Sequence, residues 1–372
     1  MVKMANKVAH LTSAHPRYDI RIFIKMCSSL AEHDYAVSLV VADGKGDEVK
    51  NGVSIIDVGA NTGGRLSRMT KIVDLVFQKA KELDVSVYHL HDPELLPVGL
   101  KLKKLGKKVI FDAHEDLPKQ ILGRPYLIKP TRVILSKVLA MYEIWACRKF
   151  DAIIAATPFI ANKFLKTNAN TVNVNNFPLL DELSNISEWT EIQNEVAYVG
   201  AMAENRGAIE MVEALKYTQG VCLNLVGQFS EKEVEEKIKN HQEWAKVNSL
   251  GFLNRNQVND ILARSRVGIV TFHPAANHID AQPNKMFEYM SAGLPIVTSN
   301  FPLWQQIVES TQCGLCVDPL NPKAIGMAIQ YLIDNPAEAE RMGKNGRNAV
   351  EDKYNWPIEE IKLLDLYKGI LK

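Results

Sequence analysis

The chain has 372 residues, 47% of them hydrophobic and 23% charged, with a formal net charge of +1. A single hydrophobic core rarely grows past roughly 250–300 residues, so this length predicts two domains. The composition excludes collagen-like and intrinsically disordered proteins. No apolar run approaches the roughly 20 residues that span a bilayer, and no signal peptide is recognisable. We therefore expect a cytoplasmic protein.

The near-neutral total hides an asymmetry of charge along the chain. Residues 1–178 contain 26 Lys and Arg against 17 Asp and Glu, whereas the remainder contains 18 against 26. The excess is densest at residues 97–149, with 12 basic against 4 acidic side chains interleaved with apolar ones. This indicates that the first half meets something anionic. A membrane leaflet is the favoured partner, because no nucleic-acid motif accompanies the basic stretch. A solvated basic surface without a partner is the open alternative.

Short β-branched runs alternate with amphipathic stretches along the chain, a pattern typical of parallel sheets covered by helices. In the first half we expect strands at 8–13, 36–42, 54–58, 85–91, 108–112 and 151–156, and helices at 19–31, 66–83, 94–105 and 131–149. The polar stretch 173–194 is the predicted linker. After it we expect strands at 196–199, 221–226, 267–271, 296–299 and 314–317, and two terminal helices at 337–352 and 357–371. The prediction is two α/β domains.

Several familiar sites are absent or weak. The chain has no Gly-x-Gly-x-x-Gly after a strand, no P-loop and no Gly-x-Ser-x-Gly elbow, which argues against dinucleotide dehydrogenases, P-loop enzymes and α/β-hydrolases. His89 and His91 share one strand face, but no third metal ligand has sensible spacing, so a structural or acceptor-side role is favoured. Cys313 and Cys316 have metal-like spacing without a second pair, and we expect two small buried residues.

The sharpest signal is the stretch Asp280–Ser299, in which a loop leads into a helix that starts near Pro283. Backbone N–H groups at such a helix start form an anion site, and Lys285 adds a positive charge. Glu288 lies about one turn inside, where a carboxylate can accept hydrogen bonds from vicinal ribose hydroxyls. The simpler alternative is a helix that carries one exposed acid.

This stretch resembles the acid-x7-acid motif of glycosyltransferase family 4, retaining nucleotide-sugar enzymes with the GT-B fold that include bacterial polysaccharide-type enzymes. The resemblance implies that Glu288 binds the donor ribose and that Asp280, in place of the usual Glu, approaches the donor sugar. It also implies donor binding by Lys285 and Asn284 at the helix start.

Further segments resemble the same family in the same order along the chain. Gly200 to Gly207 resembles the strand-loop-helix that clamps the diphosphate, with Arg206 as its one remaining cation; the alternative is an exposed Arg at a helix start. His114, after the strand 108–112, resembles the strand-end His that contacts the donor sugar. Gly251 lies where family members contact the nucleotide base.

The loop after the first strand lacks the Gly pair of many family members. It resembles instead a bacterial subset with His-Pro and Asp-x-Arg-Ile, here His15-Pro16-Arg17 followed by Asp19-Ile-Arg21-Ile22. The resemblance places His15, Arg17 and Arg21 on the acceptor or phosphate side of the site.

The family resemblance implies a GT-B architecture, two Rossmann-like domains with parallel sheets facing an interdomain cleft. We expect an N-terminal acceptor domain at 1–178, a nucleotide-sugar domain at 179–355, and a helix at 356–372 that crosses back. The expected function is retaining transfer of a sugar from a nucleoside diphosphate to a hydroxyl of a glycan or lipid-linked acceptor in cell-surface polysaccharide synthesis. Two alternatives remain open, a nucleotide-sugar 2-epimerase of the same architecture and a non-catalytic two-lobed sugar-binding protein.

The expected reaction needs no cofactor and no divalent metal, because Arg206 and Lys285 neutralise the departing diphosphate. His114, Asp280 and Arg206 are the expected catalytic residues. The expected partners are the nucleotide-sugar donor, the acceptor and an anionic membrane surface, but no nucleic acid. The protein is then cytoplasmic, with peripheral attachment to the inner face of the cell membrane.

Overall fold

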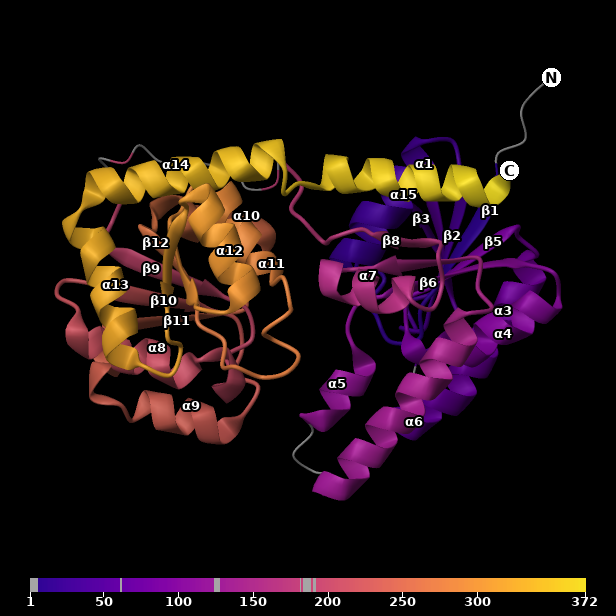
Figure 1. The fold of residues 1–372 in the computed structure, drawn as a ribbon, viewed down its shortest axis with the longest axis horizontal. Helices are drawn as coiled ribbons and strands as arrows, with labels where there is room; N and C mark the ends of the chain where they lie inside the picture. The colour runs from indigo at the N-terminus through magenta and orange to yellow at the C-terminus, as the bar shows by residue number, and fades with distance from the viewer. Residues whose placement is uncertain (1–5, 61, 124–127, 181, 183–188, 190–191) are drawn as a thin grey trace. The chain divides into compact units, whose positions relative to one another are not determined.

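The computed structural model describes residues 6–60, 62–123, 128–180, 182, 189 and 192–372, and they form two compact units (Figure 1). Unit 1 comprises Met1–Asn176 with Pro357–Lys372, and unit 2 comprises Phe177–Trp356. Each unit is built around its own sheet. The C-terminal helix α15 (Trp356–Leu371) lies against unit 1, where Glu359 accepts a hydrogen bond from the backbone N–H of Asn175 at 2.9 Å.

Unit 1 contains an eight-stranded sheet in the order β3-β4-β2-β1-β5-β6-β7-β8. All neighbouring strands are parallel except β3 and β4. The strands are β1 (Lys7–Leu11), β2 (Ala36–Val41), β3 (Glu48–Lys50), β4 (Val53–Asp57), β5 (Val87–Leu90), β6 (Lys108–Ala113), β7 (Ala152–Ala155) and β8 (Thr171–Asn173). The helices before α15 are η1 (Ile20–Cys27), α1 (Ser28–Glu32), α2 (Arg65–Ser67), η2 (Arg68–Ile72), α3 (Val73–Leu83), η3 (Pro93–Leu95), α4 (Leu96–Lys104), α5 (Leu117–Leu122), α6 (Lys129–Cys147) and α7 (Pro158–Leu165).

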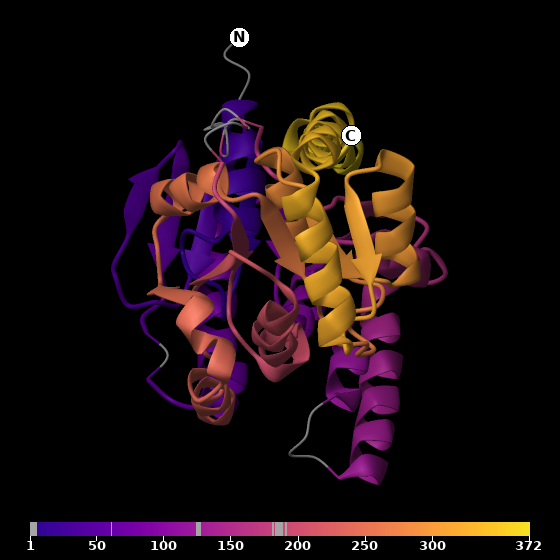
Figure 2. The ribbon, with the colours of Figure 1, turned by 90° about the vertical axis from the view of Figure 1, so that its left-hand side faces the viewer.

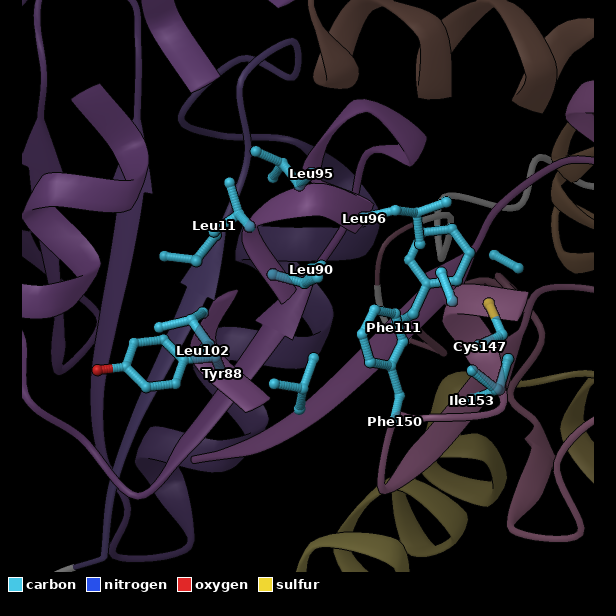
Figure 3. Packing of buried hydrophobic residues seen from close by; sticks show 14 of the residues in the cluster. Leu11, Tyr88, Leu90, Leu95, Leu96, Leu102, Phe111, Cys147, Phe150 and Ile153 are labelled. Atoms are coloured by element: carbon cyan, nitrogen blue, oxygen red, sulfur yellow. The ribbon is translucent and has the colours of Figure 1, made fainter. Parts of the chain in front are cut away.

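Apolar strand residues of unit 1 pack against helices that cover the sheet. Tyr88, Leu90 and Phe111 from the strands share one cluster with Leu102 from α4 and Phe150 from the turn after α6 (Figure 3). Strands buried on both faces need continuous apolar runs, and β5 and β7 are buried along their whole length.

Unit 2 contains a six-stranded parallel sheet in the order β11-β10-β9-β12-β13-β14. The strands are β9 (Glu195–Val199), β10 (Cys222–Val226), β11 (Val247–Gly251), β12 (Val267–Val270), β13 (Ile296–Ser299) and β14 (Gly314–Val317). The helices are η4 (Glu204–Arg206), α8 (Ala208–Ala214), η5 (Leu215–Tyr217), α9 (Lys232–Lys239), η6 (Gln242–Lys246), α10 (Arg255–Arg264), α11 (Asn284–Ser291), α12 (Pro302–Thr311), α13 (Pro322–Asp334) and α14 (Pro336–Asp352). Val196 and Tyr198 face one apolar cluster and Ala197 faces the other, so helices cover both faces of the sheet (Figure 2).

The two strand orders share a feature that positions the candidate sites. In each sheet the first strand of the unit lies beside its fourth parallel strand, β1 beside β5 and β9 beside β12. The chain connections reverse direction at this switch point, and ligands of open α/β sheets bind outside the carboxyl ends of the strands there. Thr12, His91 and Thr271 directly follow β1, β5 and β12, and Gly200 directly follows β9.

The strands and helices expected from the sequence are confirmed to within a few residues, with local differences. The helix expected at 19–31 begins as the π-helix η1, which Asp19 caps by accepting hydrogen bonds from two backbone N–H groups. The short elements β3, α5, α7 and β8 were not expected. The predicted linker 173–194 lies partly outside the described residues, and its first residue closes β8.

Candidate functional site

The carboxyl end of β9 in unit 2 forms a compact cationic site. Gly200 follows β9 with a φ of 133°, and a Cβ at this position would lie 2.8 Å from Nζ of Lys285. Only glycine adopts such a backbone without strain, so the backbone and the ammonium group come close together. Arg206, at the end of η4, lies over the ring of Phe272 at 5.7 Å. The predicted residues Gly200, Arg206 and Lys285 are therefore brought together by the fold.

The ammonium group of Lys285 is buried without a hydrogen-bond partner among the described residues. It lies 3.8 Å from the ring centroid of Tyr198. Burial, followed by repulsion from Arg206, lowers the pKa of Lys285 well below its ordinary value. A buried cation beside a second cation is costly unless an anion pairs with both.

Two further buried polar atoms near this site have no partner among the described residues. They are Oγ1 of Thr271, directly after β12, and Oε1 of Gln282, in the loop before α11. Buried polar groups are normally hydrogen-bonded, so unsatisfied atoms that gather at one place indicate a ligand. With Lys285 and Arg206, this end of the sheet can bind a group with several negative charges.

Glu288 lies one turn into α11 and already has a partner. Its Oε1 accepts a hydrogen bond from Nη2 of Arg255 at 2.9 Å, and Nε of Arg255 donates to Glu182 at 2.6 Å. One Glu288 oxygen is thus held in place by an arginine. Arg255 was not predicted from the sequence, although its position at the first turn of α10, four residues after Gly251, was a usable signal.

The remaining residues predicted on the donor side lie in the loop before α11, at the start of α11 and at the end of β11. Asp280 lies half-buried in the loop between β12 and α11, and Asn284 is the first residue of α11. Gly251 ends β11 with a φ of 64°, and its carbonyl accepts a hydrogen bond from the N–H of Gly227. The next residue, Phe252, is 81% exposed, so it offers an aromatic face that could stack on a planar ring.

In unit 1, His114 lies at the carboxyl end of β6 and is bound to a buried carboxylate. Nε2 of His114 lies 2.8 Å from Oδ2 of Asp112, and the His114 side chain is 19% exposed. Asp112 is fully buried. Burial alone would raise its pKa, but Arg21, His114 and His91 hold that pKa well below the usual range. His114 is therefore oriented by a charged carboxylate and remains accessible on its other side.

Arg21 is the main partner of that carboxylate. Nε and Nη2 of Arg21 donate to the two oxygens of Asp112 at 2.9 and 2.7 Å, and Nη1 donates to the carbonyl of Val174. Each of the three guanidinium nitrogens thus donates a hydrogen bond inside the protein. Its predicted role as a direct ligand of an acceptor or phosphate does not fit these contacts, which favour positioning of Asp112.

His15 is the second accessible histidine at this end of the unit 1 sheet. Its ring lies 5.0 Å from the ring of His114, and its nitrogens lie 3.4 and 3.3 Å from Asp19 and Asp92. Partial burial opposes a charged ring, but the two carboxylates outweigh it and raise the pKa of His15. Asp92 is itself fixed by hydrogen bonds from the backbone N–H and hydroxyl of Ser13. His15 and His114 can therefore act on the same ligand.

Arg17 lies apart from this pair. Its side chain is buried, donates two hydrogen bonds to Asp43 at 2.8 and 2.7 Å, and also contacts Glu48 and the carbonyl of Gly46. Arg17 was expected on the acceptor or phosphate side. The physical reason for the difference is that Asp43 and Glu48, distant in sequence, satisfy its donors.

Two groups of potential metal ligands occur among the described residues, namely His10, His89 and His91, and His91, Asp112 and His114. The third histidine that the sequence did not reveal is His10, which stands opposite His89 in the β1–β5 pairing. However, Nδ1 of His10 lies 2.9 Å from Nε2 of His91. Nitrogens that share a tetrahedral zinc lie about 3.3 Å apart, so this distance fits a hydrogen bond better than a metal.

Family models match residues in both units of the chain. The model "Glycosyltransferase Family 4" matches residues 21–173, and "Glycosyl transferases group 1" matches residues 181–349. Glycogen synthase of Mycobacterium tuberculosis is 20% identical over 297 residues, 70% of each chain. The capsular polysaccharide biosynthesis glycosyltransferase CapM of Staphylococcus aureus is 24% identical over 188 residues, 48% of this chain and 46% of its own.

Solved structures share the fold over nearly the whole chain. Sucrose-phosphate synthase of Thermosynechococcus elongatus superposes with a TM-score of 0.80 at 17% identity, covering 98% of this chain and 99% of the other. Anabaena HepE in complex with UDP-glucose gives 0.74 at 15% identity, covering 98% and 99%. The chain belongs to the family 4 glycosyltransferases and is a glycosyltransferase of the GT-B fold.

Proposed function

We propose that the protein transfers a sugar from a nucleoside diphosphate to a hydroxyl of a glycan or lipid-linked acceptor, with retention at the anomeric carbon, in cell-surface polysaccharide synthesis. The observation that carries the proposal is the buried, unpartnered ammonium of Lys285 beside Arg206 at the switch point of unit 2. A diphosphate supplies the charge that this site needs. The HepE structures with UDP and with UDP-glucose support a nucleotide-sugar donor.

The proposed chemistry is electrostatic. As the sugar departs, the diphosphate gains negative charge, and Lys285, Arg206 and the first N–H groups of α11 stabilise that charge. Glu288, held by Arg255, accepts hydrogen bonds from the ribose. Asp280 and His114 position the sugar, and no covalent nucleophile is assigned. Since protein cations neutralise the leaving group, turnover should persist in excess EDTA.

The first experiment is a thermal-shift panel of UDP, GDP, ADP and their glucose, galactose and mannose conjugates. We expect one nucleotide series to raise the Tm, because a ligand that binds only the folded state stabilises it. The selected donor is then followed by NMR at the anomeric proton with and without acceptor. Transfer with retained configuration supports the proposal, whereas an epimer formed from donor alone would identify a 2-epimerase, and binding without any turnover a sugar-binding protein.

The acceptor side is proposed to work at an anionic membrane, where α6 is the contact. Ile134, Val138, Met141 and Trp145 recur on one side of this helix and are 64, 56, 71 and 49% exposed. The opposite side of the helix is buried, through Ser136, Glu143, Ala146 and Cys147. An apolar stripe this exposed is typical of an interface with another phase or molecule.

Charges around the stripe select the membrane as that partner. The exposed basic residues Lys129, Lys137, Arg148 and Lys149 lie along α6 or directly after it, and Nζ of Lys149 lies 3.8 Å over the ring of Trp145. The only acid of the helix, Glu143, is buried and paired with Lys163. Each basic side chain near an anionic leaflet contributes about 1 kcal/mol. The described residues include no helix long and apolar enough to cross a bilayer, so attachment would be peripheral.

Co-sedimentation with vesicles of phosphatidylglycerol and phosphatidylcholine tests this surface. Met141→Glu places a charge on the stripe and should reduce binding at least about tenfold, since a glutamate at the boundary forfeits apolar burial and repels the leaflet. Met327→Glu is the matched control, because Met327 is 58% exposed on α13 of unit 2. Equal binding of both variants, or dimerisation through α6 without lipid binding, would contradict the proposal.

A further inference from the structure

A chain of hydrogen bonds crosses the interior of unit 1 and ends at the carboxylate that holds His114. Nδ1 of His91 lies 3.2 Å from Oδ2 of Asp112, and Nε2 of His91 lies 2.9 Å from Nδ1 of His10. Nε2 of His10 lies 3.1 Å from the hydroxyl of Tyr367, which lies 2.9 Å from Nδ1 of His89. All five side chains are buried. Three strands and the C-terminal helix therefore contribute to one network.

The direction of every hydrogen bond in this chain follows from its charged end. Asp112 is ionised and can only accept, so His91 must donate from Nδ1 and accept at Nε2. His10 must then donate from Nδ1 and accept at Nε2. The one donor that can satisfy that nitrogen is the hydroxyl of Tyr367, which leaves its oxygen to accept from Nδ1 of His89. A single arrangement of protons satisfies all four links.

The burial of the rings agrees with this arrangement. Burial lowers the pKa of His10 and His89 well below the ordinary value and also lowers that of His91, so each ring is neutral with one proton. In the rings of His10, His89 and His91 this proton lies on Nδ1. The only atom left over is Nε2 of His89, which has no partner among the described residues, and an unpaired acceptor is tolerated better than an unpaired N–H.

We propose that Tyr367 is a positioning residue for His114: its hydroxyl satisfies Nε2 of His10 and so holds the rings of His10 and His91 in place, and His91 with Asp112 fixes the ring of His114. The C-terminal helix thereby helps to determine the orientation of a site residue that lies far from it in the sequence. The catalytic consequence rests on the proposed glycosyl transfer. The proton arrangement itself does not, and it can be tested without a substrate.

Tyr367→Phe removes the hydroxyl alone, and Tyr35→Phe is its matched control. The rings of Tyr35 and Tyr367 meet edge to face at 5.8 Å, but Tyr35 lies outside the hydrogen-bonded chain. Both variants are first compared with wild type by Tm, so that a general loss of packing is recognised as such.

The primary readout is the 15N NMR spectrum of the histidine rings in protein labelled at histidine. In wild type we expect His10, His89 and His91 to carry their proton on Nδ1. In Tyr367→Phe the ring-nitrogen shifts of His91 and His114 should change, whereas in Tyr35→Phe they should match wild type. The proposal is overturned if His91 carries its proton on Nε2. It is also overturned if the His91 and His114 shifts are unchanged in Tyr367→Phe, or if EDTA alters the wild-type spectrum.

The second readout uses the donor selected by the nucleotide panel. Tyr367→Phe should lower kcat about tenfold, equivalent to about 1.4 kcal/mol, with the KM for donor changed less than about twofold. Tyr35→Phe should retain wild-type kcat. An unchanged kcat in Tyr367→Phe would overturn the link to catalysis. If wild-type protein binds no nucleotide, the proposed function fails, and the NMR result still decides whether Tyr367 positions His114.

Discussion

Replacing Lys285 with Met should change stability and ligand binding in opposite directions. Met keeps the length of the side chain and removes its charge. Because burial and Arg206 lower the pKa of Lys285 well below the ordinary 10.5, the charged amine destabilises the folded state. This penalty is fully present below the folded-state pKa and disappears above the unfolded-state value. At pH 7, Lys285→Met should therefore raise the Tm of the unliganded protein, by roughly 2–4 °C for each kcal/mol relieved in a domain of this size.

The gain is partly offset by lost contacts between the amine and the ring of Tyr198, which lies 3.8 Å away. Such cation–π contacts are worth up to about 2 kcal/mol when desolvated. Nucleotide binding changes in the other direction. A hydrogen bond between charged groups is worth about 1.5–3 kcal/mol, so the Kd for UDP should rise roughly 10- to 150-fold.

Isothermal titration calorimetry with UDP, or with whichever nucleotide the panel selects, measures the affinity, and calorimetric unfolding measures the Tm. Lys237→Met on α9 is the control, because Lys237 is exposed and should change neither quantity by more than the error. A Lys285→Met protein that is less stable and binds the nucleotide as tightly as wild type would refute the reasoning that Lys285 is an unpaired cation awaiting a phosphate.

Three further outcomes follow from the geometry of the two units. Asp112→Asn leaves the buried guanidinium of Arg21 without its charged partner and should cost about 3–5 kcal/mol in urea unfolding; a loss under about 1 kcal/mol would contradict the assignment. Interactions with His15 and backbone N–H groups outweigh burial and lower the pKa of Asp19 from 3.8 to about 2. Its stabilisation of about 2 kcal/mol should thus be complete above pH 4 and vanish as the pH falls through 2, and Asp19→Asn should lack this dependence in acid titrations. Arg255→Met should loosen Glu288 and abolish discrimination between UDP and its 2′-deoxy analogue, which calorimetry measures; retained discrimination would separate Arg255 from ribose recognition.

The cationic site of unit 2 could be predicted because its parts are close together in sequence. Asn284, Lys285 and Glu288 share the first turns of one helix, and a loop followed by a helix start is a local pattern. Gly200 and Arg206 likewise belong to one strand-loop-helix segment. Arg255 was not predicted because it contacts Glu288 from another helix, 33 residues away in the sequence. The periodicity of a single helix or strand does not indicate a contact between two separate elements.

In unit 1 the residue types could be read from the sequence, but the partners of these residues could not. Arg21 has the position and charge expected of a phosphate ligand, yet Asp112, 91 residues later, neutralises it in the core. His89 and His91 were recognised as a pair, whereas His10 and Tyr367 join them only because β1 lies beside β5 and α15 returns to unit 1. Pairings between non-local strands depend on the whole topology, which no window of sequence contains.

The acidic partners of Arg17 and Arg21 also change which residues account for the exposed positive charge of residues 1–178. Arg17 and Arg21 are buried and paired with acids, so they add nothing to the field outside the protein. The unpaired charge must then reside on exposed side chains, and a dense group of them surrounds the apolar stripe of α6. Attraction between exposed charges and a leaflet is screened over about 8 Å at physiological ionic strength, whereas buried pairs are screened much less. Raising the salt concentration should therefore release the protein from anionic vesicles while leaving its unfolding free energy nearly unchanged, a separation that attachment through buried arginines could not produce.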